Sequence, residues 1–189
     1  SMWFNEFTDD KFFDSLIAIC CYSQKAVDII SSGGQYEELY LSRKVFVKQF
    51  DDLEKQSTIE IILFLSVQFA VGVISAIQLS SILSNYVSQK LRSLLEPNKF
   101  TYNFFIAGLG SFGSMNMNFT SDIDLLIVAD DVLENPDIQK DFQNFLSDAK
   151  KLLAPFEIDF KLRPEGKKSP LVWDIRNYTE YLNKRARVW

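Results

Sequence analysis

The sequence predicts an α+β fold: helices first, then a small α/β unit, then another helix. Helical periodicity of apolar residues continues as far as Pro97, whereas short apolar or alternating runs, typical of strands, appear after it. An amphipathic helical segment separates the last two of these runs. We therefore expect a helical region over residues 1–97, an α/β domain over 98–175 and, over 176–189, the start of a truncated C-terminal helix.

The helical region divides into three expected segments. A Ser-Ser-Gly-Gly loop follows the first segment, and the second is expected over residues 36–52. Ser57 or Thr58 can open the third segment, which runs through Leu95. The first segment opens on the capping pair Asp9-Asp10 and has an apolar face of Phe12, Phe13, Leu16, Ile17 and Cys20.

The third segment contains a stretch without charge. No Asp, Glu, Lys or Arg occurs from Ile61 to Gln89, which is long enough to span a bilayer. Ser, Gln and Asn residues interrupt the stretch, however, so it favours one or two buried core helices over a transmembrane helix. We expect no association with a membrane.

The C-terminal half is expected to contain strands and helices in alternation. A strand is expected over residues 104–107 and another over 122–128, after a loop rich in Gly, Ser, Asn and Met. A strand over 156–162 alternates strictly between apolar and charged residues, and a last helix runs from about residue 176 to 189. The helix between the last two strands covers residues 137–153 and has an apolar face of Ile138, Phe142, Phe145, Leu146 and Ala149.

Composition excludes several kinds of catalytic site. Because the chain has no histidine, it has no Ser-His-Asp triad, Cys-His dyad or histidine zinc site. Its two cysteines are the adjacent Cys20 and Cys21, which lack the spacing of a zinc or redox motif and suit a reducing cytoplasm. The net charge of −5 disfavours a nucleic acid as partner, whereas a nucleotide can bind if metal ions screen its phosphates.

Two carboxylates at the start of an apolar strand form the first candidate site. Residues two apart on a strand project from the same face, so Asp122 and Asp124 point together and repel each other unless a cation lies between them. Oxygen ligands of this kind suit Mg²⁺ or Mn²⁺. The Asp-Ile-Asp tripeptide alone could equally cap a turn, but Gly113-Ser114 upstream, which can approach a phosphate, favours the functional interpretation.

A third carboxylate, Asp159, lies in the middle of the alternating strand, on its polar face. By itself it could belong to an exposed face of alternating charges. Beside Asp122 and Asp124 on a neighbouring strand, it would complete a set of three carboxylates suited to two metal ions and a triphosphate.

Three ordered motifs resemble the glutamine synthetase adenylyltransferases. Residues 110–125 (GSFGSMNMNFTSDIDL) resemble the family pattern GxLGGxELNxxSDIDL, and residues 159–172 (DFKLRPEGKKSPLV) resemble DxRLRPxGxxGPLV. Residues 178–181 (YTEY) and 185–189 (RARVW) resemble the family's Y…ARxWE. The resemblance covers residues 104–189 and implies a polymerase-β-like nucleotidyltransferase domain with a small mixed sheet.

The resemblance also implies roles for particular residues. Asp122 and Asp124 would bind Mg²⁺ (or Mn²⁺), and Asp159 would bind one of the ions and help to remove a proton. ATP is the implied substrate, and the candidate phosphate-binding residues are Gly113, Ser114, Ser121, Lys161 and Arg163. Of these, Arg163 could equally be a surface cation.

The implied reaction moves AMP between ATP and a tyrosine of glutamine synthetase, or removes it by phosphorolysis. Departures from the pattern leave two alternatives open: another acceptor, such as a signalling protein or a small molecule, and a regulatory module that binds a nucleotide without turnover. These departures are Ser114, Asn116, Lys161 and Ser169. They leave all three carboxylates in place.

Overall fold

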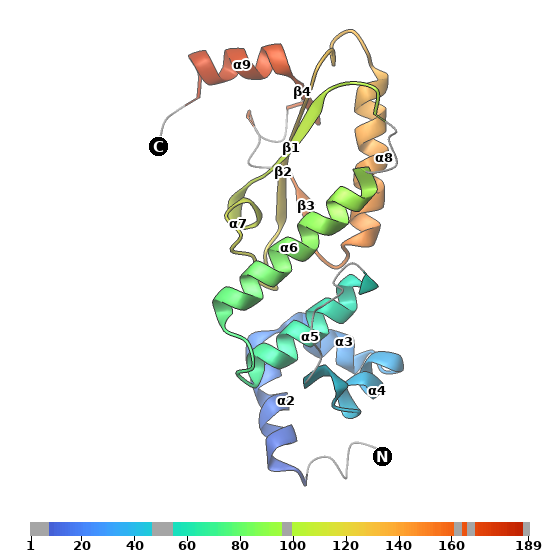
Figure 1. Ribbon diagram of the computed structural model, residues 1–189, viewed down its shortest axis with the longest axis vertical. Coiled ribbons are helices and arrows are strands. Elements are labelled where there is room, and N and C mark those ends of the chain that lie inside the picture. The colour runs from blue at the N-terminus through green and yellow to red at the C-terminus, as the bar shows by residue number, and fades with distance from the viewer. Residues whose placement is uncertain (1–7, 47–54, 96–99, 161–163, 166–168, 187–189) are drawn as a thin grey trace. The chain divides into compact units, whose positions relative to one another are not determined.

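The computed structural model describes residues 8–46, 55–95, 100–160, 164–165 and 169–186, which belong to two compact units (Figure 1). Unit 1 ends at Tyr86 and unit 2 begins at Val87. The fold is α+β, as the sequence predicts: unit 1 is helical, and unit 2 contains a four-stranded mixed sheet with helices. The domain boundary expected near Pro97 lies outside the described residues.

A central helix that is buried over most of its length organises unit 1. Residues 61–68 of α5 (Thr58–Ala70) are buried without a break, and the helix packs against α2, α3 and η1. A helix that is apolar on every side belongs in a core, which explains the first part of the charge-free stretch, whereas Val71, Val73 and Ile77 in its later part are exposed. No helix in the described part of the chain is long and apolar enough to cross a membrane. The other elements of unit 1 are α2 (Asp10–Tyr22), α3 (Gln24–Ser31), α4 (Gln35–Leu41), η1 (Lys44–Phe46) and the first part of α6 (Ala76–Leu95).

The helix starts in unit 1 follow the sequence prediction more closely than the helix ends do. Asp9 caps α2, and Ser57 forms a capping box with Glu60 at the start of α5. The second helix is much shorter than the expected 36–52: α4 ends at Leu41, and Arg43 adopts a left-handed φ of 61°.

The apolar face predicted for the first helix is confirmed only at Phe12, which is buried, and at Leu16, which packs against the core. The buried residues of α2 are Phe12, Ser15 and Ile19, whereas Phe13 and Ile17 are 43% and 47% exposed. The helix is rotated so that the Ser15 hydroxyl reaches the Tyr40 hydroxyl at 2.9 Å inside the core. A long-range hydrogen bond between buried groups therefore takes precedence over the apolar periodicity.

Unit 2 is built on strand β2, which every other strand of the sheet contacts. β1 pairs with β2 antiparallel, whereas β3 and β4 both pair with β2 in parallel. The sheet is therefore small and mixed, as the resemblance implied. Its elements are β1 (Phe104–Gly108), α7 (Gly110–Gly113), β2 (Ile123–Ala129), α8 (Asp137–Leu152), β3 (Ile158–Asp159), β4 (Val172–Asp174) and α9 (Ile175–Lys184).

The two faces of the sheet pack against different helices (Figure 1). On one face, Phe104 packs against Phe142 of α8, whose predicted apolar positions are all buried. On the other face, Leu126, Val128 and Trp173 form a buried cluster with Tyr178 and other residues of α9. Because strand residues alternate between faces, Asp122 and Asp124 belong to the face of Leu126 and Val128.

The strands differ from the prediction in two places. β4 was not foreseen, because its three residues are too few to show an alternating pattern. The strand expected over 156–162 contributes only Ile158 and Asp159 to the sheet, and residues 161–163 lie outside the described part.

Candidate active site

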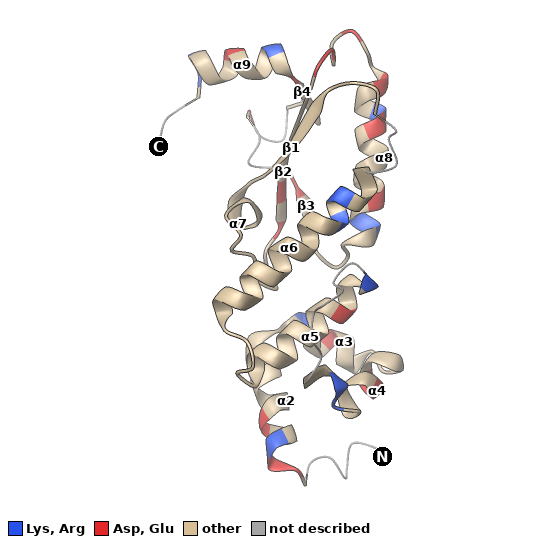
Figure 2. Cartoon of the chain, in the orientation of Figure 1, with Lys and Arg blue, Asp and Glu red and all other residues tan. Residues whose placement is uncertain are grey.

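The register of two parallel strands brings two of the predicted carboxylates together. Asp124 of β2 lies directly opposite Asp159 of β3, and the preceding pair is Ile123 with Ile158. Neighbouring strands are about 4.8 Å apart, so the two acidic side chains begin from adjacent positions. Both residues are partly buried, and Figure 2 shows acidic residues along β2 and β3.

Asp122 lies just before β2 and is also partly buried. The Ile123 N–H donates to the Glu157 carbonyl at 2.8 Å, and the Leu109 N–H donates to the Asp124 carbonyl at 2.9 Å. These bonds fix the backbone at Ile123 and Asp124. Asp122 therefore starts on the same face as Asp124, two residues away.

The helical turn α7 lies close against the end of β1, and this contact requires glycine. A Cβ atom on Gly113 would lie 2.3 Å from the Gly108 carbonyl oxygen and 2.7 Å from its carbon. Gly113 therefore allows the turn to pack against the strand. This is a second reason for glycine at this position, beside the phosphate contact expected from the sequence.

The polar groups of the predicted phosphate-binding turn are engaged within the turn itself. The Gly113 N–H donates to the Leu109 carbonyl and the Ser114 N–H to the Gly110 carbonyl. The Ser114 hydroxyl donates to the Gly110 carbonyl at 3.0 Å. A phosphate contact by Ser114 therefore requires its hydroxyl to rotate, and phosphate binding by this turn stays a prediction.

The other predicted phosphate-binding residues are placed only in part. Ser121 lies directly before Asp122, and its hydroxyl accepts a hydrogen bond from the Asn118 N–H at 2.9 Å. Lys161 and Arg163 lie outside the described residues. Their roles stay predictions.

The donor set has the chemistry that Mg²⁺ or Mn²⁺ prefers, since all three predicted ligands are carboxylates. The backbone brings Asp124 and Asp159 into register, but the described residues include no group of three acidic, histidine or cysteine side chains placed to hold a metal ion. One oxygen of Asp159 accepts a hydrogen bond from the Phe160 N–H at 2.6 Å. The residues thus fit the ion in type and backbone position, and their side chains would have to turn toward one another.

A second charged network in unit 2 was missed by the sequence analysis. Arg176 donates to Asp174 at 2.9 and 3.0 Å and to Glu134 at 2.6 and 2.8 Å. The Asp174 side chain is only 1% exposed, and hydrogen bonding from Arg176 lowers its pKa to about 2. Asp174 also caps α9, so the network fixes the junction of β4 and α9. In the sequence, the network is indicated by Asp174 and Arg176, two residues apart at the start of a helix.

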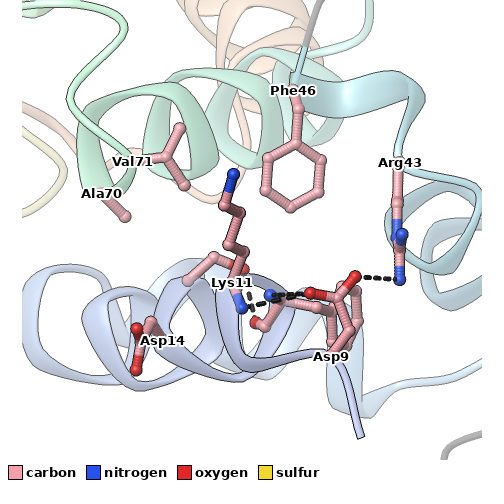
Figure 3. A pocket seen from close by; sticks show the side chains of 9 residues that line it. Asp9, Lys11, Asp14, Arg43, Phe46, Ala70 and Val71 are labelled. Atoms are coloured by element: carbon pink, nitrogen blue, oxygen red, sulfur yellow. Dashed lines mark hydrogen bonds and ion pairs between the residues drawn. The ribbon is translucent and has the colours of Figure 1, made fainter. Parts of the chain in front are cut away.

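A cavity of about 560 Å³ in unit 1 contains none of the predicted site residues (Figure 3). Asp9 and Arg43 form an ion pair of 2.9 Å at this cavity, and Arg43 lies over the Phe12 ring. In unit 2, a cavity of about 260 Å³ is lined by Gly113 and residues of α6, β1 and β2. Cavity size therefore does not locate the candidate site, which rests on the strand register and the motifs.

Comparison with known proteins gives one family. A family model described as glutamate-ammonia ligase adenylyltransferase matches residues 43–189. A relative from Bifidobacterium longum is 33% identical over 93 residues, which are 44% of this chain and 9% of the relative. A relative from Xanthomonas oryzae pv. oryzae is 32% identical over 105 residues, covering 46% of this chain and 11% of the relative.

A third relative, from Chromobacterium violaceum, is 29% identical over 96 residues, which are 47% of this chain and 10% of the relative. All three relatives bear the name bifunctional glutamine synthetase adenylyltransferase/adenylyl-removing enzyme. The chain thus spans about a tenth of the length of the curated relatives it matches. Helices α2, α3 and α4 precede the residues that the family model matches.

Proposed function

This chain belongs to the glutamate-ammonia ligase adenylyltransferase family, and we propose that unit 2 is a nucleotidyltransferase domain that moves AMP between ATP and a tyrosine of glutamine synthetase. The observation that carries the proposal is the register of Asp124 opposite Asp159. Two neighbouring carboxylates on one face of a sheet repel each other and lose contact with water, so their pairing does not stabilise the fold. A cation-assisted reaction supplies a reason for the pairing.

In the transfer direction, the tyrosine oxygen bonds to the α-phosphorus of ATP. The bond between that phosphorus and the bridging oxygen breaks, pyrophosphate leaves, and the phenol proton passes to a base. Asp159 is the proposed base, because it lies at the partly exposed end of β3 opposite Asp124. In the removing direction, an oxygen of inorganic phosphate bonds to the phosphorus of the tyrosyl-AMP and the bond from that phosphorus to the tyrosine oxygen breaks. The tyrosine oxygen takes up a proton, so ADP and the unmodified tyrosine side chain are the products.

Asp122, Asp124 and Asp159 are the proposed ligands of Mg²⁺. When bound, divalent ions would neutralise charge on the triphosphate and make the attacking oxygen more acidic. The protein's own part is to hold the three carboxylates on one face and to place ATP beside them. The turn α7, which contains Gly113, packs against β2, and Ser121 directly precedes Asp122; these groups are the proposed phosphate side of the site.

An assay with the full chain tests this function directly. Purified chain, glutamine synthetase, Mg²⁺ and ATP labelled at the α-phosphate should give labelled glutamine synthetase. In the removing direction, glutamine synthetase that already carries the labelled AMP should give labelled ADP when phosphate is supplied. Asp124→Asn removes a charge at little change in shape, and we expect it to lower the rate at least about a hundredfold. Asp148→Asn is the matched control, because Asp148 lies exposed on α8 and pairs only with its helical neighbour Lys151 among the described residues. Full activity in Asp124→Asn would refute the assignment.

The same material separates the alternative of a silent module. Calorimetry with ATP and Mg²⁺ that shows binding, together with no turnover in either direction, would favour a regulatory role. The engaged hydroxyl of Ser114 and the replacement of the family's acidic residue by Asn116 are the features that support that alternative. Turnover with another protein or small molecule as acceptor would keep the chemistry and change the partner.

A further inference from the structure

The segment that joins α7 to β2 is fixed to the core at two points. Met117 is fully buried and Phe119 is 6% exposed, whereas Asn116, Asn118 and Thr120 between and beside them are exposed. Apolar side chains therefore fix the path of the segment, and polar ones face outward. The segment ends at Asp122, the first of the three proposed metal ligands.

Asn118 closes a tight turn within this segment. Its carboxamide oxygen accepts hydrogen bonds from the Thr120 N–H and the Thr120 hydroxyl, both at 2.8 Å. Its N–H donates to the Ser121 hydroxyl at 2.9 Å, and its carbonyl accepts from the Ser121 N–H at 3.2 Å. An Asn side chain that bonds the backbone two residues ahead holds a turn that the backbone alone leaves loose.

The turn has two consequences for its neighbours. Asp122 lies before the first residue of β2, so strand pairing does not hold its backbone from the N-terminal side, and the Asn118 turn does. The Ser121 hydroxyl already accepts a bond, so its own proton is left for another acceptor, and none of the described residues supplies one. A phosphate oxygen beside Asp122 is such an acceptor.

We propose that Asn118 is a positioning residue: through its carboxamide oxygen it holds the turn that places Asp122 beside Asp124 and directs the Ser121 proton outward. The inference rests on the proposed function, in which Asp122 is a metal ligand and the Ser121 hydroxyl is a hydrogen-bond donor to phosphate. The Asn118 carboxamide oxygen acts through Thr120, to which it is hydrogen-bonded.

Two variants of the full chain test the turn without reference to activity. Asn118→Ala removes both bonds of the carboxamide oxygen, and we expect the solvent exchange of the Thr120 amide, measured by NMR, to become about fivefold faster. Asn118→Asp keeps an acceptor oxygen at the same position and should restore slow exchange. Asn116→Ala is the matched control, because it changes an exposed carboxamide in the same segment but leaves the two bonds to the Asn118 carboxamide oxygen in place. Unchanged exchange in Asn118→Ala, or equal acceleration in Asn116→Ala, would overturn the positioning role.

Binding of Mn²⁺ alone, followed by electron paramagnetic resonance, connects the turn to the site. We expect about tenfold weaker binding in Asn118→Ala, comparable to the loss of other groups that orient a metal ligand, and no change in Asn116→Ala. Unchanged Mn²⁺ affinity in Asn118→Ala, while Asp122→Asn weakens it, would overturn the inference and leave the proposed function standing. Unchanged affinity in Asp122→Asn would instead remove the metal role from the proposed function.

Discussion

Removing the charge of Asp174 should make unit 2 less stable at neutral pH, and the loss of stability should become smaller as the pH falls. The Asp174 carboxylate is 1% exposed and accepts hydrogen bonds from Arg176, which lower its pKa to about 2, whereas the ordinary value is 3.8. Asp174→Asn keeps the size of the side chain and remains a good helix cap, so it isolates the charge. The carboxylate is ionised at pH 7 in both the folded and the unfolded chain, but only the folded chain gains the interaction with Arg176.

The magnitude follows from the difference between the two pKa values. A folded pKa near 2 against an unfolded value of 3.8 corresponds to about 2 kcal/mol of stability at pH 7. Because the folded pKa is lowered, this contribution is complete above about pH 5 and is lost as the pH falls toward 2. By pH 3 roughly half of it remains. The free energies of unfolding of Asp174→Asn and the unaltered chain should therefore converge as the solution is acidified.

The assay must report on unit 2 alone, because the chain has two compact units. The chain has three tryptophans, so Trp3→Phe with Trp189→Phe leaves Trp173 as the single fluorophore, and Trp173 packs in the cluster beside α9. Urea unfolding in this background gives the difference in unfolding free energy between Asp174→Asn and the unaltered side chain, once at pH 7 and once at pH 3. Asp148→Asn serves as control and should change stability by less than about 0.5 kcal/mol, since its ion pair with Lys151 is exposed. An Asp174→Asn deficit that is equal at both pH values would refute the electrostatic reasoning.

Two further predictions concern the turn α7 and the core of unit 1. Gly113→Ala places a Cβ 2.3 Å from the Gly108 carbonyl oxygen, so we expect unit 2 to lose about 1–3 kcal/mol of stability in the single-tryptophan assay and ATP binding to weaken in calorimetry. Ser114→Ala, which introduces no such clash, is the control. A Gly113→Ala variant with unchanged stability would contradict the close contact. Burial raises the pKa of Tyr86 to about 12, so unit 1 should lose stability between pH 10 and pH 12 as the unfolded chain ionises first. Tyr86→Phe should remove that part of the pH dependence, which urea unfolding followed by circular dichroism at pH 8 and pH 11 would measure. An equal loss of unfolding free energy between these pH values in the two proteins would show that Tyr86 is not responsible.

The parts of the fold that follow local patterns were predictable from the sequence. Strand β2 lies where an acidic start and an apolar run predicted a strand, and α8 buries all five residues of its predicted apolar face. A strand carrying Asp159 was also expected beside the strand of Asp124, and β3 pairs with β2; the register that sets Asp159 opposite Asp124 was not itself predicted. Periodicity fixes which face a residue occupies, and two strands in one small sheet leave few possible registers.

The parts that failed depend on contacts between distant residues. The face of α2 is set by the bond from Ser15 to Tyr40, 25 residues away, and no local pattern shows that bond. Arg176 reaches Glu134 across 42 residues, so only the Asp174 half of its network had a signal in the sequence. Strand β4 exists because it pairs with β2, and its own three residues carry little preference.

The distribution of residues along β2 explains how one strand can serve both the core and the proposed site. Leu126 and Val128 lie under α9 and are buried, whereas Asp122 and Asp124, on the same face, are only partly buried. A fully buried carboxylate would have to lose its charge or find a counter-ion, at a cost of several kcal/mol. At the partly exposed end of the strand the carboxylates stay in contact with solvent, where a triphosphate can approach them. If apolar residues of α9 also packed over this end of the strand, they would stabilise the sheet but bury the carboxylates and abolish the proposed chemistry. The proposed site therefore needs α9 to leave this end of β2 uncovered as much as it needs the acidic residues.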